Sequence, residues 1–257
     1  MARRLRPTRR MSIIAPIAFF IICCAGWWTT SAFTGIESWR LPSPADTWER
    51  AQALASQSSF WVRVFTTASE AIFGSVLGAI IALPLAYLIY RSPLIQAAVE
   101  PFLGATQAIP AIALAPLLVL WIGYGLWSIT ALCALLVFFP ILVSSVVGLR
   151  HLDSEVLEAA ELDGASGLTM ATSIELPLAA PSILGGVRNG FTLSVTGAVV
   201  GEMVMGGTGL GQLLTQARTN VDTSGMFVTI IVLCTMATVI YILIYRIERS
   251  HRYAISH

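Results

Sequence analysis

Long stretches without a charged residue dominate the pattern of hydrophobic and polar positions along this chain. Four of them contain no Asp, Glu, Lys or Arg: residues 11–36, 71–90, 101–149 and 223–245. Because a helix needs about 20 apolar residues to cross the hydrocarbon layer of a membrane, the first, second and fourth stretches predict one crossing each. The third is long enough for two crossings, with a turn at Gly123-Tyr124-Gly125, and a further crossing fits residues 181–203. The pattern thus predicts six membrane-spanning helices.

Composition supports the same fold class. The chain of 257 residues is 56% hydrophobic and 11% charged, whereas a soluble domain carries about 25% charged residues. We therefore expect an all-α integral membrane protein. The first stretch has a cleaved signal peptide as its alternative, but it exceeds the 7–15 apolar residues of a signal core and carries Trp27-Trp28 near its end, which favours an uncleaved helix.

The basic residues predict the orientation, since short cytoplasmic loops carry an excess of Lys and Arg. All fifteen are arginine, and with the N-terminus inside only Arg40, Arg50, Arg63 and Arg218 fall outside. Both termini are therefore expected in the cytoplasm. The predicted divisions are a basic N-terminus (1–12), a first crossing (13–36), an external segment (37–61), a core of five crossings (62–250) that contains a cytoplasmic loop (150–180), and a cytoplasmic tail (251–257).

Several local features predict packing. In the external segment Asp46 is expected to cap a short helix, whose apolar face lies either on the outer membrane surface or against a partner protein. Pairs of glycines four residues apart, at 74/78, 186/190 and 197/201, permit close helix contacts. Gln107, beside Pro110 in an interrupted helix, predicts either a passage lining or a simple kink.

The loop at 150–180 differs from every other segment because it holds six of the fourteen acidic residues. Asp153 can cap a helix there, Gly164 interrupts it, a second short helix follows, and Pro177 is expected to end the unit. Two short helices with an apolar stripe and no lipid to face should dock onto a protein.

This loop also carries a specific motif. Glu158-Ala159-Ala160, three residues, Gly164, nine residues, then Ile174, one residue, Leu176 and Pro177 resembles the EAA loop of ABC-importer permeases. The Leu41-Pro42-Ser43-Pro44 segment and Gly209-Leu210-Gly211 resemble the branch that serves nitrate, sulfonates, taurine, bicarbonate and thiamine precursors. The similarity covers roughly residues 13–250.

The resemblance implies a permease of the type I ABC-importer fold in the bacterial inner membrane, importing a small anionic or polar solute. Its implied partners are a second permease copy, two cytoplasmic ATPase subunits, an external solute-binding protein and membrane lipid, with no nucleic acid. No cofactor would be bound by this chain, since ATP and Mg²⁺ would bind the ATPase. The ATPase-coupling residues would be Glu158, Ala159, Ala160, Gly164, Ile174, Leu176 and Pro177.

Other functions fit the residues less well. A phosphate-binding Walker A loop needs a lysine, and the chain has none; no catalytic group or metal site is expected either. An ion-coupled secondary transporter is the main alternative, but it would place acids deep in the bilayer, whereas Glu70, Glu100 and Glu202 are expected at the ends of crossings. Gln107, Arg188 and Glu202 are the polar groups expected to touch a passage, and a purely structural role is open for each.

Overall fold

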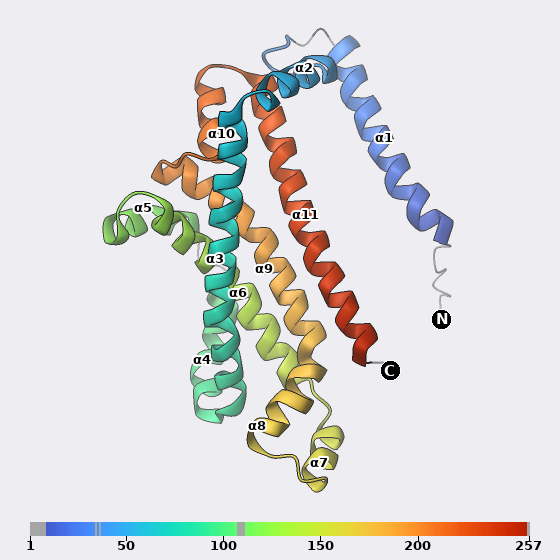
Figure 1. Ribbon diagram of the computed structural model, residues 1–257, viewed down its shortest axis with the longest axis vertical. Helices are drawn as coiled ribbons and strands as arrows, with labels where there is room; N and C mark the ends of the chain where they lie inside the picture. The colour runs from blue at the N-terminus through green and yellow to red at the C-terminus, as the bar shows by residue number, and fades with distance from the viewer. Residues whose placement is uncertain (1–8, 34, 36, 107–110, 256–257) are drawn as a thin grey trace.

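The computed structural model describes residues 9–33, 35, 37–106 and 111–255, and this part of the chain is entirely helical apart from short connections. Figure 1 shows the order along the chain. The helices are α1 (Arg9–Phe33), α2 (Pro44–Ala55), α3 (Ser58–Arg91), α4 (Pro93–Thr106), α5 (Ala111–Ile122), α6 (Leu126–Arg150), α7 (Ser154–Leu162), α8 (Gly167–Met170), a π turn (Ala171–Glu175), α9 (Leu176–Met205), α10 (Leu210–Thr219) and α11 (Thr223–Ile255).

Helix α6 forms the centre of the bundle, with α3 and α9 packed against it. Glycines make these contacts possible, as predicted from their spacing. A Cβ at Gly74 would clash with Cys133 of α6, and one at Gly78 would lie 2.7 Å from the carbonyl oxygen of Ala134. On α9, a Cβ at Gly186 would lie 2.6 Å from that of Ser144. Close backbone approach therefore brings the three long helices together, and large apolar side chains such as Ile89, Leu132 and Ile141 fill the core beside these glycines.

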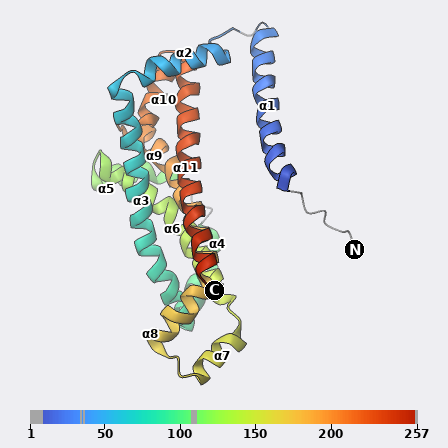
Figure 2. The same ribbon diagram turned by 45° about the vertical axis from the view of Figure 1, so that its right-hand side comes forward.

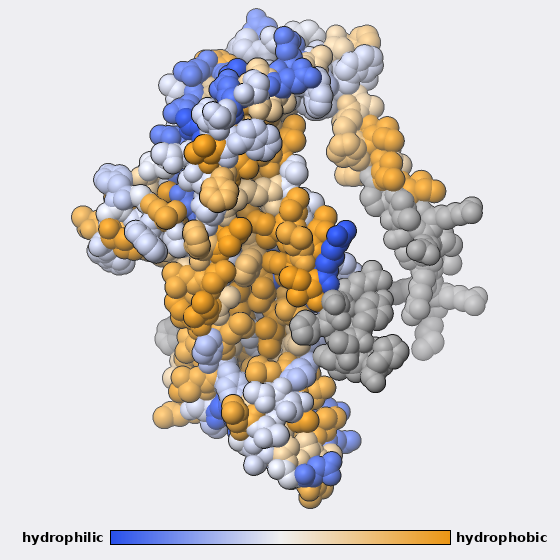
Figure 3. Space-filling view, viewed as in Figure 1, coloured by the Kyte–Doolittle hydropathy of each residue, from blue (hydrophilic) through white to orange (hydrophobic). Residues whose placement is uncertain are grey.

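Four helices of the described residues are long and apolar enough to span a membrane: Ser58–Arg91, Leu126–Arg150, Gly167–Met205 and Thr223–Glu248. Two shorter apolar helices, Ile17–Phe33 and Ala113–Ile122, accompany them. In Figure 3 apolar residues cover the middle of the visible face, while hydrophilic residues gather toward its two ends. This distribution is typical of a protein whose apolar middle section faces lipid and whose polar ends face water.

The segments outside the bundle lie mostly at its ends. Figure 1 shows α2 lying across one end near α10, and α7 and α8 projecting from the other. Helix α1 stands apart over much of its length in both ribbon views (Figures 1 and 2). It is attached near α2, where Trp27 stacks on Phe227 and its indole N–H donates to the carbonyl of Pro42.

Two expectations about the helices near the α2 end are wrong. Helix α3 begins at Ser58, well before residue 71, so Glu70 lies inside the helix and not at its end. Helix α2 is capped by Ser43, whose hydroxyl accepts from the N–H of Asp46, while the Asp46 carboxylate accepts from the Ser43 N–H. Asp46 thus completes a capping box instead of being the cap itself.

Pro177 also behaves differently from the expectation that it ends the loop. The chain stays helical from Gly167 to Met205, with Pro177 in the first turn of α9. The π turn immediately before it explains why. There the N–H of Leu176 donates to the carbonyl of Ala171, five residues back, and this wider turn accommodates a proline that would clash in a regular α-helix.

Candidate functional site

The loop between α6 and α9 is built by two well-defined helix ends. Asp153 caps α7, and its carboxylate accepts from the N–H of Glu155 at 3.0 Å. At the other end Gly164 adopts φ +90°, which glycine reaches without the steric penalty of a side chain. Its N–H donates to the carbonyl of Glu161, and the N–H of Ala165 donates to that of Ala160, both at 2.9 Å. These two bonds form a Schellman motif, so Gly164 fixes the angle between α7 and α8.

The outer surface of this loop combines exposed acidic side chains with exposed leucines, and nothing within the described residues covers it. No residue of α7 is buried. Leu162 is 90% exposed and Leu168 is 79% exposed. Glu158, Ala159 and Gly164 are exposed as well, and Ala160 is half-buried. Two nearly bare leucines at a membrane protein's polar end indicate a surface that another protein covers.

Glu175 anchors the inner side of the loop, although the sequence marked it only as one of the loop's acidic residues. Glu175, between the motif residues Ile174 and Leu176, is 2% exposed. Its carboxylate accepts from the hydroxyls of Tyr87 at 2.9 Å and Tyr90 at 3.2 Å and pairs with the guanidinium of Arg91 at 3.4 Å. The only sign of this role in the sequence was an acidic residue flanked directly by the apolar residues Ile174 and Leu176. Of its motif neighbours, Ile174 and Pro177 are half-buried and Leu176 is 38% exposed.

The three residues expected along a passage are not brought together. Gln107 lies outside the described residues. Arg188 faces α11, where its guanidinium donates to the carboxylate of Glu248 at 2.8 Å and lies 5.1 Å from the ring centre of Tyr241. Within one chain these contacts attach α9 to α11.

Glu202 lies near the opposite end of α9 and is 1% exposed. It accepts from the hydroxyl of Thr67 on α3 at 2.6 Å and from the backbone N–H of Gly211. The carboxyl of Glu70, 2% exposed, lies within hydrogen-bonding reach of Glu202. Helices α3 and α9 therefore bury a pair of carboxyl groups between them, Glu202 near the end of α9 and Glu70 within α3.

The loop that follows α9 is shaped by this cluster. The N–H of Leu210 donates to Thr67 Oγ1 at 2.8 Å. A Cβ at Gly209 would clash with Glu202 Oε1 and with Thr67, and one at Gly211 would clash with the carbonyl of Val199. Both glycines of the Gly209-Leu210-Gly211 segment are thus required by close approach.

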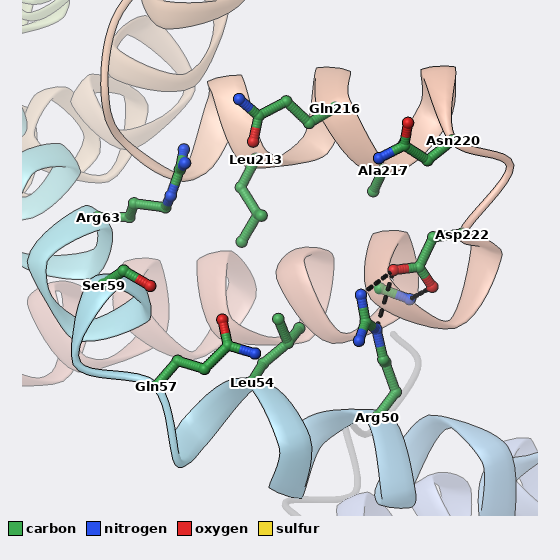
Figure 4. Close-up of a pocket in the computed structure, with 11 residues that line it drawn as sticks. Arg50, Leu54, Gln57, Ser59, Arg63, Leu213, Gln216, Ala217, Asn220 and Asp222 are labelled. Atoms are coloured by element: carbon green, nitrogen blue, oxygen red, sulfur yellow. Dashed lines mark hydrogen bonds and ion pairs between the residues drawn. The ribbon is translucent and has the colours of Figure 1, made fainter.

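A polar pocket of about 240 Å³ opens at the α2 end of the molecule. Figure 4 shows Arg50 of α2 reaching Asp222, with Arg63 and Gln216 on the far side of the pocket. Arg50 and Asp222 form an ion pair, with 2.5 Å between Nη2 of Arg50 and Oδ2 of Asp222. With Gln57 and Asn220 also lining it, this pocket can hydrogen-bond a polar group that approaches from outside the bundle.

Comparison with known proteins identifies the family and the fold. A family described as the binding-protein-dependent transport system inner membrane component matches residues 74–253, a range that contains the Gly164 loop, Glu175 and Glu202. The chain belongs to this family. It is a permease of the ABC transport systems.

Relatives of this permease serve different solutes. It is 40% identical to the riboflavin transport system permease protein of Chloroflexus aurantiacus over 223 residues, 87% of this chain and 83% of the relative. It is 32% identical to the formylaminopyrimidine transport permease protein of Halalkalibacterium halodurans, with 93% and 95% covered. The taurine transport system permease protein of Escherichia coli is 25% identical, with 82% and 78% covered.

Solved structures agree on the fold. The permease superimposes on a chain of an inward-facing methionine ABC transporter with a TM-score of 0.67 at 21% identity, covering 75% of this chain and 96% of the other. The expected fold class, an all-α membrane protein resembling type I ABC-importer permeases, is confirmed at this level.

Proposed function

We propose that this permease forms the translocation pathway of an ABC importer and is driven through the α7–α8 loop by a separate ATPase. The observation that carries the proposal is a rigid, exposed two-helix loop, set by the Schellman turn at Gly164 and bearing bare leucines, in a chain of this family. The coupling residues are Glu158, Ala159, Ala160, Gly164, Ile174, Leu176 and Pro177. The proposed assembly has two permease copies, two ATPase subunits that bind ATP and Mg²⁺, and an external binding protein.

The proposed topology has six crossings with both termini inside. Support comes from the four long apolar helices, the two shorter ones in α1 and α5, and the arginine asymmetry. The loop and the α2 end lie at opposite ends of the bundle in Figures 1 and 2. Single cysteines at Ser58 and Ser166, in a background without the native four, should react with an impermeant maleimide from opposite sides of the membrane. Labelling of both from outside would refute the orientation.

The coupling role is tested at Gly164. A side chain there is strained by about 1–2 kcal/mol at this positive φ, although nothing in the chain lies within 4 Å of its Cβ position. Gly164→Asp should therefore keep normal abundance in the membrane but lose the co-purifying ATPase and the uptake. Gly185→Ala is the matched control, since its Cβ position is also open and its φ is ordinary.

A second variant tests the surface without straining the turn. Leu162→Ser removes an apolar side chain that touches little within the chain. We expect unchanged thermal stability in detergent and weakened retention of the ATPase. Full retention of the ATPase in both Gly164→Asp and Leu162→Ser would exclude this loop as the coupling element. Uptake that continues without ATP would instead favour an ion-coupled transporter.

The proposed solute is a small polar organic molecule delivered by the binding protein. The relatives at 40% and 32% identity are named for riboflavin and formylaminopyrimidine, so nitrogen heterocycles come first, with taurine, a zwitterionic sulfonate, as the comparison. Gln107 and Arg188 remain the proposed polar groups of the passage, whereas Glu202, 1% exposed, takes the structural role that the sequence left open for it. The binding protein that co-purifies with the permease, titrated with these three compounds, tests the solute class. Arg188→Ala, measured for uptake and ATP hydrolysis, tests the passage.

A further inference from the structure

The α8–α9 helix is tied to the inner end of α3 through one buried carboxylate. Glu175 meets Tyr87, Tyr90 and Arg91, which occupy one face of the last turns of α3 at spacings of three and four residues. Three donors converge on a single acceptor group. The only ion pair in which that carboxylate takes part among the described residues is the one with Arg91.

Glu175 occupies the place where the exposed loop becomes a spanning helix. It ends the π turn, and the helix continues without a break from Gly167 to Met205. A displacement of α8 therefore also displaces Glu175, because both belong to one continuous helical backbone. Helix α3 runs from Ser58 to Arg91 with Pro84 inside it, so a displacement of its last turns acts first on the segment after Pro84, where an interior proline allows the helix to bend.

The partners of Glu175 can exchange this contact for water. Tyr87 and Tyr90 are half-buried and the side chain of Arg91 is 47% exposed. When this contact loosens during a transport cycle, its three donors keep hydrogen bonds by turning to water, and only the Glu175 carboxylate, 2% exposed, loses its partners.

We propose that Glu175 is a positioning residue that transmits movement of the α7–α8 loop to α3 and so couples ATP hydrolysis to opening of the passage. The proposal rests on the proposed function and extends it to a residue and a helix outside the docking surface. The proposal assigns two roles to one loop. Gly164, Leu162 and Leu168 bind the ATPase, and Glu175 transmits the movement of the loop to α3.

The test is the ratio of solute imported to ATP hydrolysed by the complete transporter in proteoliposomes. Glu175→Ala should keep the ATPase bound, because Glu175 is buried away from the exposed surface. We expect the ratio to fall about tenfold, the size of effect that loss of a hydrogen bond to a charged group produces. A merely destabilised transporter would lose uptake and hydrolysis in proportion and leave the ratio unchanged.

Tyr87→Phe combined with Tyr90→Phe provides the reciprocal variant, and it decides the matter if Glu175→Ala fails to accumulate. It should lower the ratio similarly, and adding it to Glu175→Ala should cause little further loss, because both remove the same contact. Glu100→Ala is the matched control. It breaks another carboxylate–arginine pair at this end of the molecule, with Arg150 at 3.0 Å, but that pair joins α4 to α6 and should leave the ratio intact.

Three results would overturn the proposal: an unchanged ratio in both variants, additive losses in the combined variant, or loss of the ATPase from Glu175→Ala. The docking role fails separately. If Gly164→Asp keeps its ATPase while the Glu175 variants still uncouple transport, the proposed docking surface is wrong and the transmission through Glu175 stands.

Discussion

Helices α3 and α9 are joined by a buried glutamate at each end of their contact, and the two glutamates differ in their surroundings. At the loop end Glu175 meets two half-buried tyrosines and an exposed arginine. At the α2 end Glu202 meets Thr67, which is 0% exposed, together with the backbone of Gly211 and the buried carboxyl of Glu70.

The difference teaches that burial of a carboxylate has two consequences, depending on its partners. Removing Glu175 releases donors that can turn to water, so the contact is lost and the fold is kept. Removing Glu202 leaves groups that water does not reach, and unpaired buried polar groups cost about 1–3 kcal/mol each. The α2 end of the contact is therefore a fixed attachment and the loop end a reversible one.

The largest expected effect is that of Glu202→Ala. The N–H of Gly211 and the hydroxyl of Thr67 lose their acceptor, beside a Glu70 carboxyl whose Oε2 already has no hydrogen-bond partner among the described residues. We expect a clear fall in unfolding temperature in detergent and in membrane abundance, larger than for Glu175→Ala. Equal stability of the two variants would contradict the distinction between the ends.

Gly209→Ala should be the next most harmful. The added methyl group would clash with Glu202 Oε1 and Thr67, and overpacking of this kind costs about 1–3 kcal/mol. Thermal unfolding of the purified permease measures the effect, with Gly185→Ala as the control in which the methyl group meets open space. A stable Gly209→Ala variant would show that the α10 loop can move away from the cluster.

Glu202→Gln should be much milder than Glu202→Ala. The amide oxygen can keep the N–H of Gly211, and the NH₂ group can donate to Thr67, whose hydroxyl then turns to the carbonyl of Arg63 at 3.2 Å. We expect near-native unfolding temperature and uptake. A Gln variant as unstable as the Ala variant would mean that the cluster needs the carboxylate itself.

The smallest effect is expected for Arg50→Ala at the polar pocket. Its ion pair with Asp222 is partly exposed, with side chains 40% and 24% accessible, and exposed pairs contribute about 0–1 kcal/mol. Thermal stability should change little and should become less sensitive to salt between 50 and 500 mM, a range over which the screening length falls from about 13 Å to about 4 Å. A large loss of stability would place this pair among the fixed attachments of α2 to α11.

The amino-acid sequence by itself determined the elements that depend on local rules. Charge-free length predicted the long apolar helices, the Asp153 cap and the positive φ of Gly164 followed from residue type, and glycine spacing predicted the contacts of Gly74 and Gly186. These features depend on a few consecutive residues or on one helix face, so they can be read without knowing the partner.

Only the tertiary structure decided how the buried acids are used. Glu175 and its partners are more than 80 residues apart, as are Thr67 and Glu202, and the spacing within either segment does not specify the other. The same limit explains the errors at Glu70 and Pro177. A charge looks unfavourable inside an apolar helix until its partner on another helix is known, and a proline looks like an end until the π turn before it gives its ring room.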